Sequence, residues 1–132
     1  MVDLKSAREE LGLTQAQLAA LLGVSLRVVQ SCEQGWRRPS ANVERHLLLL
    51  LIASRQGPGF GKRACWKTLG CPAHQREACI AYRTRQGHLC WFLTGNMCHG
   101  RPCVDWLEKK ETCEQCEFFV SLLQPEGGGS AR

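Results

Sequence analysis

Cysteine is concentrated in one part of this 132-residue chain. Of its nine cysteines, one lies apart and the others stand at Cys65, Cys71, Cys79, Cys90, Cys98, Cys103, Cys113 and Cys116. Average composition does not produce such a density. Three interpretations account for it: a disulfide framework, thiolates bound to a metal ion or an iron–sulfur cluster, or thiols packed as small apolar core residues.

The neighbouring sequence favours ligation. Disulfides need an oxidising compartment, but the N-terminus MVDLKSAREELGLTQ carries charges where a signal peptide needs an apolar segment. We therefore expect a cytoplasmic protein with reduced cysteines. Core packing explains one or two thiols rather than eight, and the spacing Cys113-x-x-Cys116 lets two sulfurs reach one metal from a tight turn.

The composition changes near the middle of the chain. Residues 1–56 hold one cysteine, whereas residues 57–132 hold eight, together with three of the four histidines and three of the four tryptophans. The sequence GPGFGK between the two parts is typical of a linker. We predict a helical domain over 1–56, a linker over 57–63, a cysteine-rich domain over 64–123 and a disordered tail over 124–132.

Charge and hydropathy limit the partners of the chain. The net charge of +5 is compatible with a polyanion. The densest apolar run, residues 47–53, is too short to cross a membrane, so we expect a soluble protein. The surplus of leucine in this run predicts a dimer contact or a seat for the C-terminal domain.

The first domain has the pattern of short helices. Apolar residues repeat at helical spacing over 4–11, and Gly12 follows where a C-terminal glycine is expected. Thr14 and Gln17 form a capping-box pattern before a second helix that ends at Gly23. Ser25 precedes a third helix that ends at Gly35, and residues 41–56 predict a fourth helix, with room for a fifth. The expected fold class is mainly α, with a four- to five-helix domain ahead of a small, loop-rich domain stabilised by a metal or cluster.

The sequence LTQAQLAALLGVSLRVVQSCEQGWRRPS resembles the phage-repressor/Cro (XRE) family of helix-turn-helix proteins over about residues 2–54. The resemblance implies that the third helix enters the major groove of DNA. The implied DNA-binding residues are Gln15, Leu26, Arg27, Gln30, Ser31, Gln34, Trp36, Arg37 and Arg38.

These residues differ in their expected roles. Arg27 and Gln30 are predicted to read base edges, whereas Gln15, Arg37 and Arg38 are predicted to contact phosphates. Trp36 departs from the family pattern, which commonly has a polar residue there. Cys32 occupies an apolar position of the family and is expected to be a buried, inert thiol, and Glu33 is expected to pair internally.

The second domain is similar to a small bacterial cysteine-rich module called the two-CW domain. The resemblance rests on the pairs Cys65-Trp66 and Cys90-Trp91, the step Cys79-Ile-Ala-Tyr82 and the closing Cys113-x-x-Cys116. Seven cysteines match the module, and we predict them as metal ligands: Cys65, Cys71, Cys79, Cys90, Cys98, Cys113 and Cys116. Cys103 does not match.

The spacing of the cysteines bears on the cofactor. A structural zinc site usually has two compact Cys-x-x-Cys pairs, and this chain has one. Dispersed thiolates fit an iron–sulfur cluster, of which a 4Fe–4S cluster is the expected form, with zinc as the alternative. His74, His88 and His99 are nearby candidates for a mixed site. The flanking Trp66 and Trp91 either screen a cluster from water or form plain core.

Together these features predict a transcriptional regulator. We expect a homodimer on double-stranded operator DNA, with DNA binding controlled by an iron–sulfur cluster that senses redox state, oxygen or nitric oxide. The alternatives are a DNA-binding regulator with purely structural zinc and a protein-binding adaptor or antitoxin-like protein. An enzyme with a small-molecule substrate is not expected, because no nucleophile–base pair or phosphate-binding glycine loop stands out.

Overall fold

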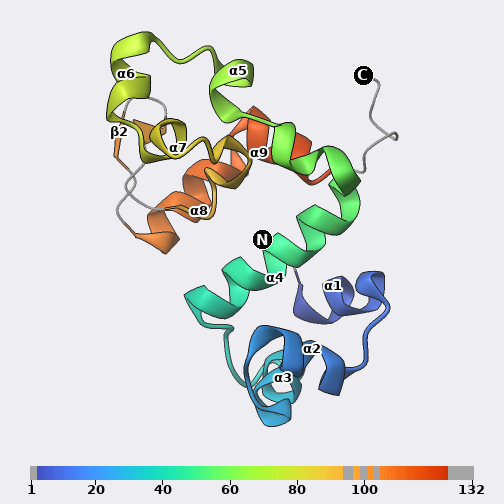
Figure 1. Cartoon of the computed structure of the whole chain (residues 1–132). Helices are drawn as coiled ribbons and strands as arrows, with labels where there is room; N and C mark the ends of the chain where they lie inside the picture. Colours follow the sequence, from blue (N-terminus) through green and yellow to red (C-terminus); the bar gives the residue numbers. More distant parts are fainter. Residues whose placement is uncertain (1–2, 94–96, 99–100, 103–104, 125–132) are drawn as a thin grey trace. The chain divides into compact units, whose positions relative to one another are not determined.

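The computed structural model describes residues 3–93, 97–98, 101–102 and 105–124, with the side chains of 97–98 and 101–102 left aside. The described chain is mainly helical, as predicted (Figure 1). A small antiparallel pair joins β1 (Met97–Cys98) to β2 (Arg101–Pro102), with Met97 opposite Pro102. The chain divides into two compact units, Met1–Ser54 and Arg55–Arg132.

The first unit contains three short helices and most of a longer one: α1 (Leu4–Leu11), α2 (Gln15–Leu22), α3 (Leu26–Glu33) and α4 (Ala41–Gln56). The predicted caps are confirmed. Thr14 and Gln17 form both hydrogen bonds of a capping box, and Ser25 accepts from the backbone N–H of Val28. Gly12 and Gly23 adopt the left-handed conformation that ends a helix. The possible fifth helix is absent, since α4 continues unbroken to Gln56.

The apolar faces of these helices enclose one core. Its buried members are Leu4, Ala7, Leu18, Ala19, Leu22, Val29, Val43, Leu47 and Leu51. Cys32 packs against this core from α3, and burial raises the pKa of its thiol. Cys32 therefore behaves as the apolar residue that the sequence predicted.

The second unit has more helix than the sequence indicated. Its helices are η1 (Gly57–Lys62), α5 (Cys65–Leu69), α6 (Ala73–Ala78), α7 (Ile80–Arg83), η2 (Gly87–Leu89), α8 (Trp106–Glu114) and α9 (Glu117–Leu122). Residues 57–62, expected to be part of a linker, form a 3₁₀ helix. The second domain was expected to be loop-rich, and α5, α6 and α7 were not predicted, because helices of one or two turns show no apolar period. The predicted tail lies outside the described residues after Gln124.

The core of the second unit is largely aromatic. Trp91, Phe118 and Phe119 are fully buried, and the indole N–H of Trp91 donates to the carbonyl of His88 at 2.9 Å. Phe118 and Phe119 lie on α9, which packs against α5 and α8. This packing places Cys65, Cys113 and Cys116 near one another.

The side chain of Gln56 fixes the start of this unit. Its amide N–H groups donate to the carbonyls of Leu122 at 2.9 Å and Gln124 at 2.7 Å, and its amide oxygen accepts from Arg63 at 2.7 Å. Arg63 also donates to the hydroxyl of Ser121 at 2.7 Å. The last turn of α4 is thereby bonded to the end of α9. No helix in the described ranges is long and apolar enough to cross a bilayer.

Candidate nucleic-acid interface and thiol cavity

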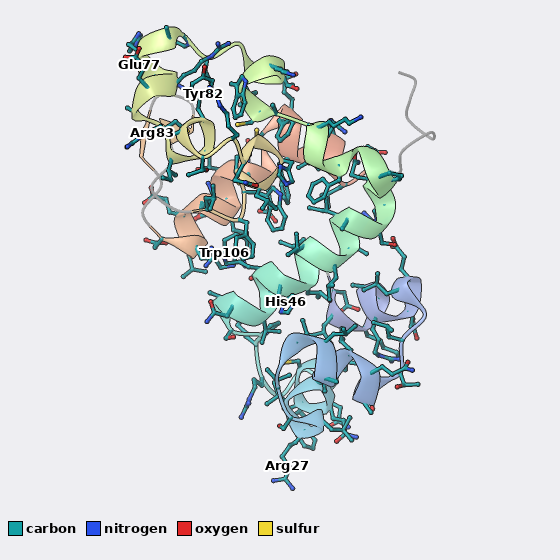
Figure 2. The ribbon with its side chains drawn as sticks, viewed as in Figure 1. Arg27, His46, Glu77, Tyr82, Arg83 and Trp106 are labelled. Carbon is teal, nitrogen blue, oxygen red and sulfur yellow. The ribbon has the colours of Figure 1, made fainter. Side chains whose placement is uncertain are left out.

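The outer face of α3 carries side chains that can reach a ligand. Arg27 and Gln30 are exposed, and Figure 2 shows Arg27 extending away from the helix. Leu26 is 42% exposed, which is high for a leucine without a partner surface. Ser31, on the same helix, is half-buried. Arg27 and Gln30 thus place a guanidinium group and an amide on the exposed face of α3, the kind of face that a recognition helix turns towards DNA.

The segment after α3 continues this surface. Gln34, Arg37 and Arg38 are exposed, and Trp36 is 81% exposed. Two exposed guanidinium groups beside an exposed indole give this segment basic and aromatic groups suited to a sugar–phosphate backbone.

A polar cluster inside the first unit holds the C-terminal end of α3. The Nε of Arg8 donates to Oε2 of Glu33 at 2.6 Å, and its Nη2 donates to Oε1 at 3.1 Å. Gln15 donates to Oε1 of Glu33 at 3.0 Å, and Arg8 also donates to the carbonyl of Leu13. The Arg8 guanidinium lowers the pKa of Glu33. Glu33 therefore pairs internally, as predicted, while Gln15 is half-buried and bonded within the protein.

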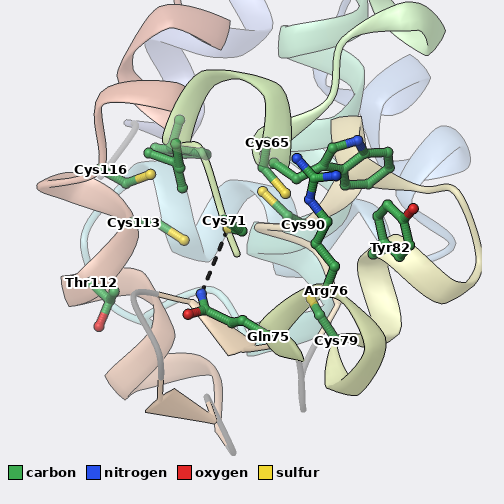
Figure 3. Close-up of a pocket in the computed structure, with 13 residues that line it drawn as sticks. Cys65, Cys71, Gln75, Arg76, Cys79, Tyr82, Cys90, Thr112, Cys113 and Cys116 are labelled. Carbon is green, nitrogen blue, oxygen red and sulfur yellow. Dashed lines mark hydrogen bonds between the residues drawn. The ribbon is translucent and has the colours of Figure 1, made fainter. Parts of the chain in front are cut away.

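The second candidate site is a cavity lined by sulfur. Six of the seven cysteines predicted as ligands line it: Cys65, Cys71, Cys79, Cys90, Cys113 and Cys116. Figure 3 shows their side chains around one space. Cys65 lies on α5, Cys113 on α8, and Cys116 is the N-cap of α9. The side chain of Cys98, and the whole of Cys103 and His99, lie outside the described residues. Segments far apart in the sequence thus bring six thiols together.

The remaining walls are largely apolar. Trp66 and Phe119 line the cavity with Leu69 and Tyr82, and the rings of Trp66 and Tyr82 meet edge to face at 4.9 Å. Gln75 donates to the sulfur of Cys71 at 3.6 Å (Figure 3). Among the residues that the structure describes, neither a carboxylate nor an imidazole lines the cavity, and His74 is exposed. Such a donor set suits a thiophilic metal or a cluster and does not suit a hard cation such as Mg²⁺.

The thiols influence one another electrostatically. A hydrogen bond from Cys90 lowers the pKa of Cys65, and the charge of Lys109 acts in the same direction. Burial raises the pKa of Cys71, and the neighbouring Cys65 and Cys79 raise it further. Each thiolate that forms in the cavity makes the next thiol harder to deprotonate, unless a cation offsets the negative charge.

The sulfurs surround the space without meeting at a point. Among the side chains that the structure describes, no three His, Cys, Asp or Glu groups are arranged to hold one metal ion. The cavity volume is about 30 Å³, room for roughly two water molecules. His88 does not line the cavity, and its Nδ1 is buried with no hydrogen-bond partner within the described chain.

Sequence reasoning missed three contributors to this site. Gln75 and Arg76 line the cavity from α6, and the Arg76 guanidinium lies 5.6 Å from the centroid of the Tyr82 ring. Lys109 is fully buried on α8, one helical turn before Cys113. Only the four-residue spacing between Lys109 and Cys113 could have placed the lysine on the cysteine-bearing face.

Gly87 lies close to Trp66 and Cys65, which line the cavity. A Cβ atom at this position would lie 2.7 Å from Cζ3 of Trp66, 2.8 Å from Cα of Ala64 and 3.0 Å from the backbone nitrogen of Cys65. Two of these neighbours are backbone atoms and cannot turn aside. Glycine is therefore required for η2 to approach the start of α5.

The comparisons with known proteins bear on the first unit. A family model described as helix-turn-helix matches residues 4–43, which confirms the resemblance found in the sequence. This region is a helix-turn-helix of a DNA-binding class, and the match supports a transcriptional regulator. No curated protein and no solved structure matches the chain. The resemblance of the second half to the two-CW module stays a prediction.

Proposed function

We propose that this protein is a transcriptional regulator whose binding to operator DNA is controlled by an iron–sulfur cluster held in the thiol cavity. The observation that carries the proposal is the convergence of six cysteines on one cavity in a chain that begins with a helix-turn-helix. The protein would act in the cytoplasm as a homodimer, because two-fold symmetric operators are read by paired recognition helices.

The DNA-binding part of the proposal rests on exposed chemistry. Arg27 and Gln30 have the side chains that pair with guanine and adenine edges in the major groove. Arg37 and Arg38 follow the recognition helix and would supply sequence-independent attraction to phosphates. Trp36 would lie flat on the flanking backbone, which gives a reason for its exposure.

The cluster part rests on the donor set and its spacing. In a 4Fe–4S cluster each cysteine binds a different iron, so the sulfurs surround the cofactor at a distance from one another. Thiols that line a space without sharing one ion site suit this geometry. When bound, the cluster would supply reactivity towards oxygen, nitric oxide or electrons. Trp66 and Phe119 would keep water away from it.

The route from the cavity to DNA would pass along the chain. Loss of the cluster would loosen α9, whose last carbonyls accept hydrogen bonds from Gln56. Gln56 is the last residue of α4, and earlier turns of α4 carry Val43, Leu47 and Leu51 of the first unit's core. A change at Gln56 would therefore reach the packing that holds the recognition helix.

Purification of the full-length protein without oxygen tests the proposal. We expect a brown protein with about four irons and four sulfides per chain, as a single 4Fe–4S cluster requires. Operator sequences would be selected from random DNA, and the affinity of cluster-loaded and cluster-free protein would be compared at fixed salt. Equal affinities of the two forms would contradict control by the cluster.

Structural zinc is the second candidate, favoured by the cavity volume of about 30 Å³. A single zinc ion is small enough for this volume, and the described thiols would have to turn inwards to share it. In that case the purified protein would be colourless and would contain one zinc ion per chain, and its DNA affinity would not change with oxygen. Metal analysis and a visible spectrum distinguish the two candidates.

A further inference from the structure

The six thiols of the cavity fall into two groups by burial. Four are buried, with exposed fractions of 8% for Cys65, 4% for Cys90, 3% for Cys113 and 6% for Cys116. The other two, Cys71 and Cys79, are only partly buried. They stand on either side of α6, on which His74 is exposed. The cavity thus has an inner set of four thiols and an outer pair.

The inner set is held by packed elements. Cys113 and Cys116 belong to α8 and the N-cap of α9, and Cys65 belongs to α5, which packs against α9. The side chains of Cys90 and Cys65 interact, and their sulfurs lie side by side in Figure 3. Buried side chains have less freedom to lose on binding, which favours these four thiols over the partly buried Cys71 and Cys79.

A buried cation accompanies the inner set. Lys109 has no exposed surface, and it precedes Cys113 by one turn of α8. An ammonium group removed from water is costly unless negative charge faces it. A lysine in this position would offset the negative charge of four thiolates or of a cluster bound to them.

We infer that Cys65, Cys90, Cys113 and Cys116 are the ligands of the inorganic centre, that Lys109 is its buried counter-charge, and that Cys71 and Cys79 are outer thiols that do not ligate. The inference rests on the proposed function, because it requires a metal or cluster in the cavity. Of the six predicted ligands whose side chains the structure describes, it retains four, with the spacing Cys65, Cys90, Cys113-x-x-Cys116.

The ligand assignment is tested by metal content after anaerobic reconstitution of the full-length chain with iron and sulfide, and separately with zinc. The double variant Cys71→Ser, Cys79→Ser should keep the metal content and absorption spectrum of the wild type. Cys90→Ser and Cys113→Ser should each lose at least half of the bound metal. A double variant that loses its metal would overturn the assignment, even if the inner variants fail to fold.

The wild type separates this inference from the proposed function. If the wild type binds neither iron nor zinc, the proposed function fails and the ligand assignment fails with it. If the wild type binds metal and the outer pair proves necessary, only the ligand assignment fails.

The role of Lys109 as a counter-charge is tested by the reduction potential of the centre, which a purely structural role would not change. Lys109→Met should retain the centre, but its midpoint reduction potential should become more negative, because a nearby positive charge no longer favours the added electron. A zinc-loaded form should instead release zinc to a chelator several-fold faster. Lys67→Met, an exposed lysine on α5, is the matched control, and Lys109→Arg should restore wild-type behaviour. An unchanged potential and release rate in Lys109→Met would overturn the role of Lys109.

Discussion

Arg8 on α1 holds Glu33 at the end of α3 through two hydrogen bonds, of 2.6 Å and 3.1 Å. The pair lies 25 residues apart in the sequence and fixes the end of the recognition helix against the first helix. Both side chains are largely shielded, with exposed fractions of 15% for Arg8 and 5% for Glu33. The orientation of the exposed face of α3, which is proposed to read DNA, therefore depends on this charged contact.

This contact predicts acid sensitivity of the first unit. The pKa of Glu33 lies below its ordinary value of 4.5 in the folded protein, so its ionised form contributes stability at higher pH. That contribution is fully present above about pH 4.5 and is lost as the pH falls through the folded pKa. Thermal unfolding followed by circular dichroism from pH 7 to pH 3 should show a falling melting temperature below pH 4.5. Arg8→Met should lower the melting temperature at pH 7 and flatten this acid dependence; an unchanged profile would contradict the assignment.

Gly87→Ala should destabilise the second unit by about 1–3 kcal/mol, because the added methyl group overpacks the start of α5. The backbone of Ala64 and Cys65 must then shift, so binding of metal in the cavity should weaken as well. Gly61→Ala is the matched control, since a Cβ atom there meets nothing within 4 Å. Urea unfolding of both variants checks the prediction, and equal stabilities would show that η2 can move aside at little cost.

Gln56→Ala should also destabilise the second unit, by about 1–3 kcal/mol, because buried carbonyls and the Arg63 guanidinium lose their partner. The proposed route to DNA adds a second expectation, namely that the variant binds operator DNA less tightly even when its cavity is loaded. Gln115→Ala removes an exposed glutamine of the same unit and serves as the control. Unfolding curves and DNA titrations on the same samples measure both effects.

Substitutions on the two parts of the DNA-binding surface should differ in kind. Arg27→Ala and Gln30→Ala should each cost about 1–3 kcal/mol of binding to a selected operator and relax the base preference at one position. Arg37→Ala and Arg38→Ala should weaken binding to all sequences and reduce the salt slope by about one each. Fluorescence anisotropy at several salt concentrations measures these effects. Lys62→Ala, an exposed change in the second unit, should leave both quantities unchanged.

The sequence predicted the first unit closely because its signals are local. A cap such as Thr14 with Gln17, or a helix-ending Gly23, is set by residues within one turn and needs no distant contact. The apolar residues spaced along α1 to α3 then pack into one core. The Arg8 partner of Glu33 could not be read in this way, because it comes from another helix.

The cavity was only partly predictable. The resemblance to the two-CW module indicated seven cysteines as ligands, and six of these seven line one cavity. Which thiols are inner and which outer depends on the packing of α5, α8 and α9, which the sequence does not show locally. Lys109 was hidden for the same reason, since a lysine in a polar stretch is usually expected to be exposed.

The order of the two units along the chain has a consequence during synthesis. The first unit is complete at Ser54, before Cys65, the first of the cavity thiols, has been translated. Domains generally fold as they emerge from the ribosome. If the cavity holds an iron–sulfur cluster, as proposed, a cell short of iron would hold chains with a finished first unit and bare sulfurs, so the supply of the metal itself would become a signal.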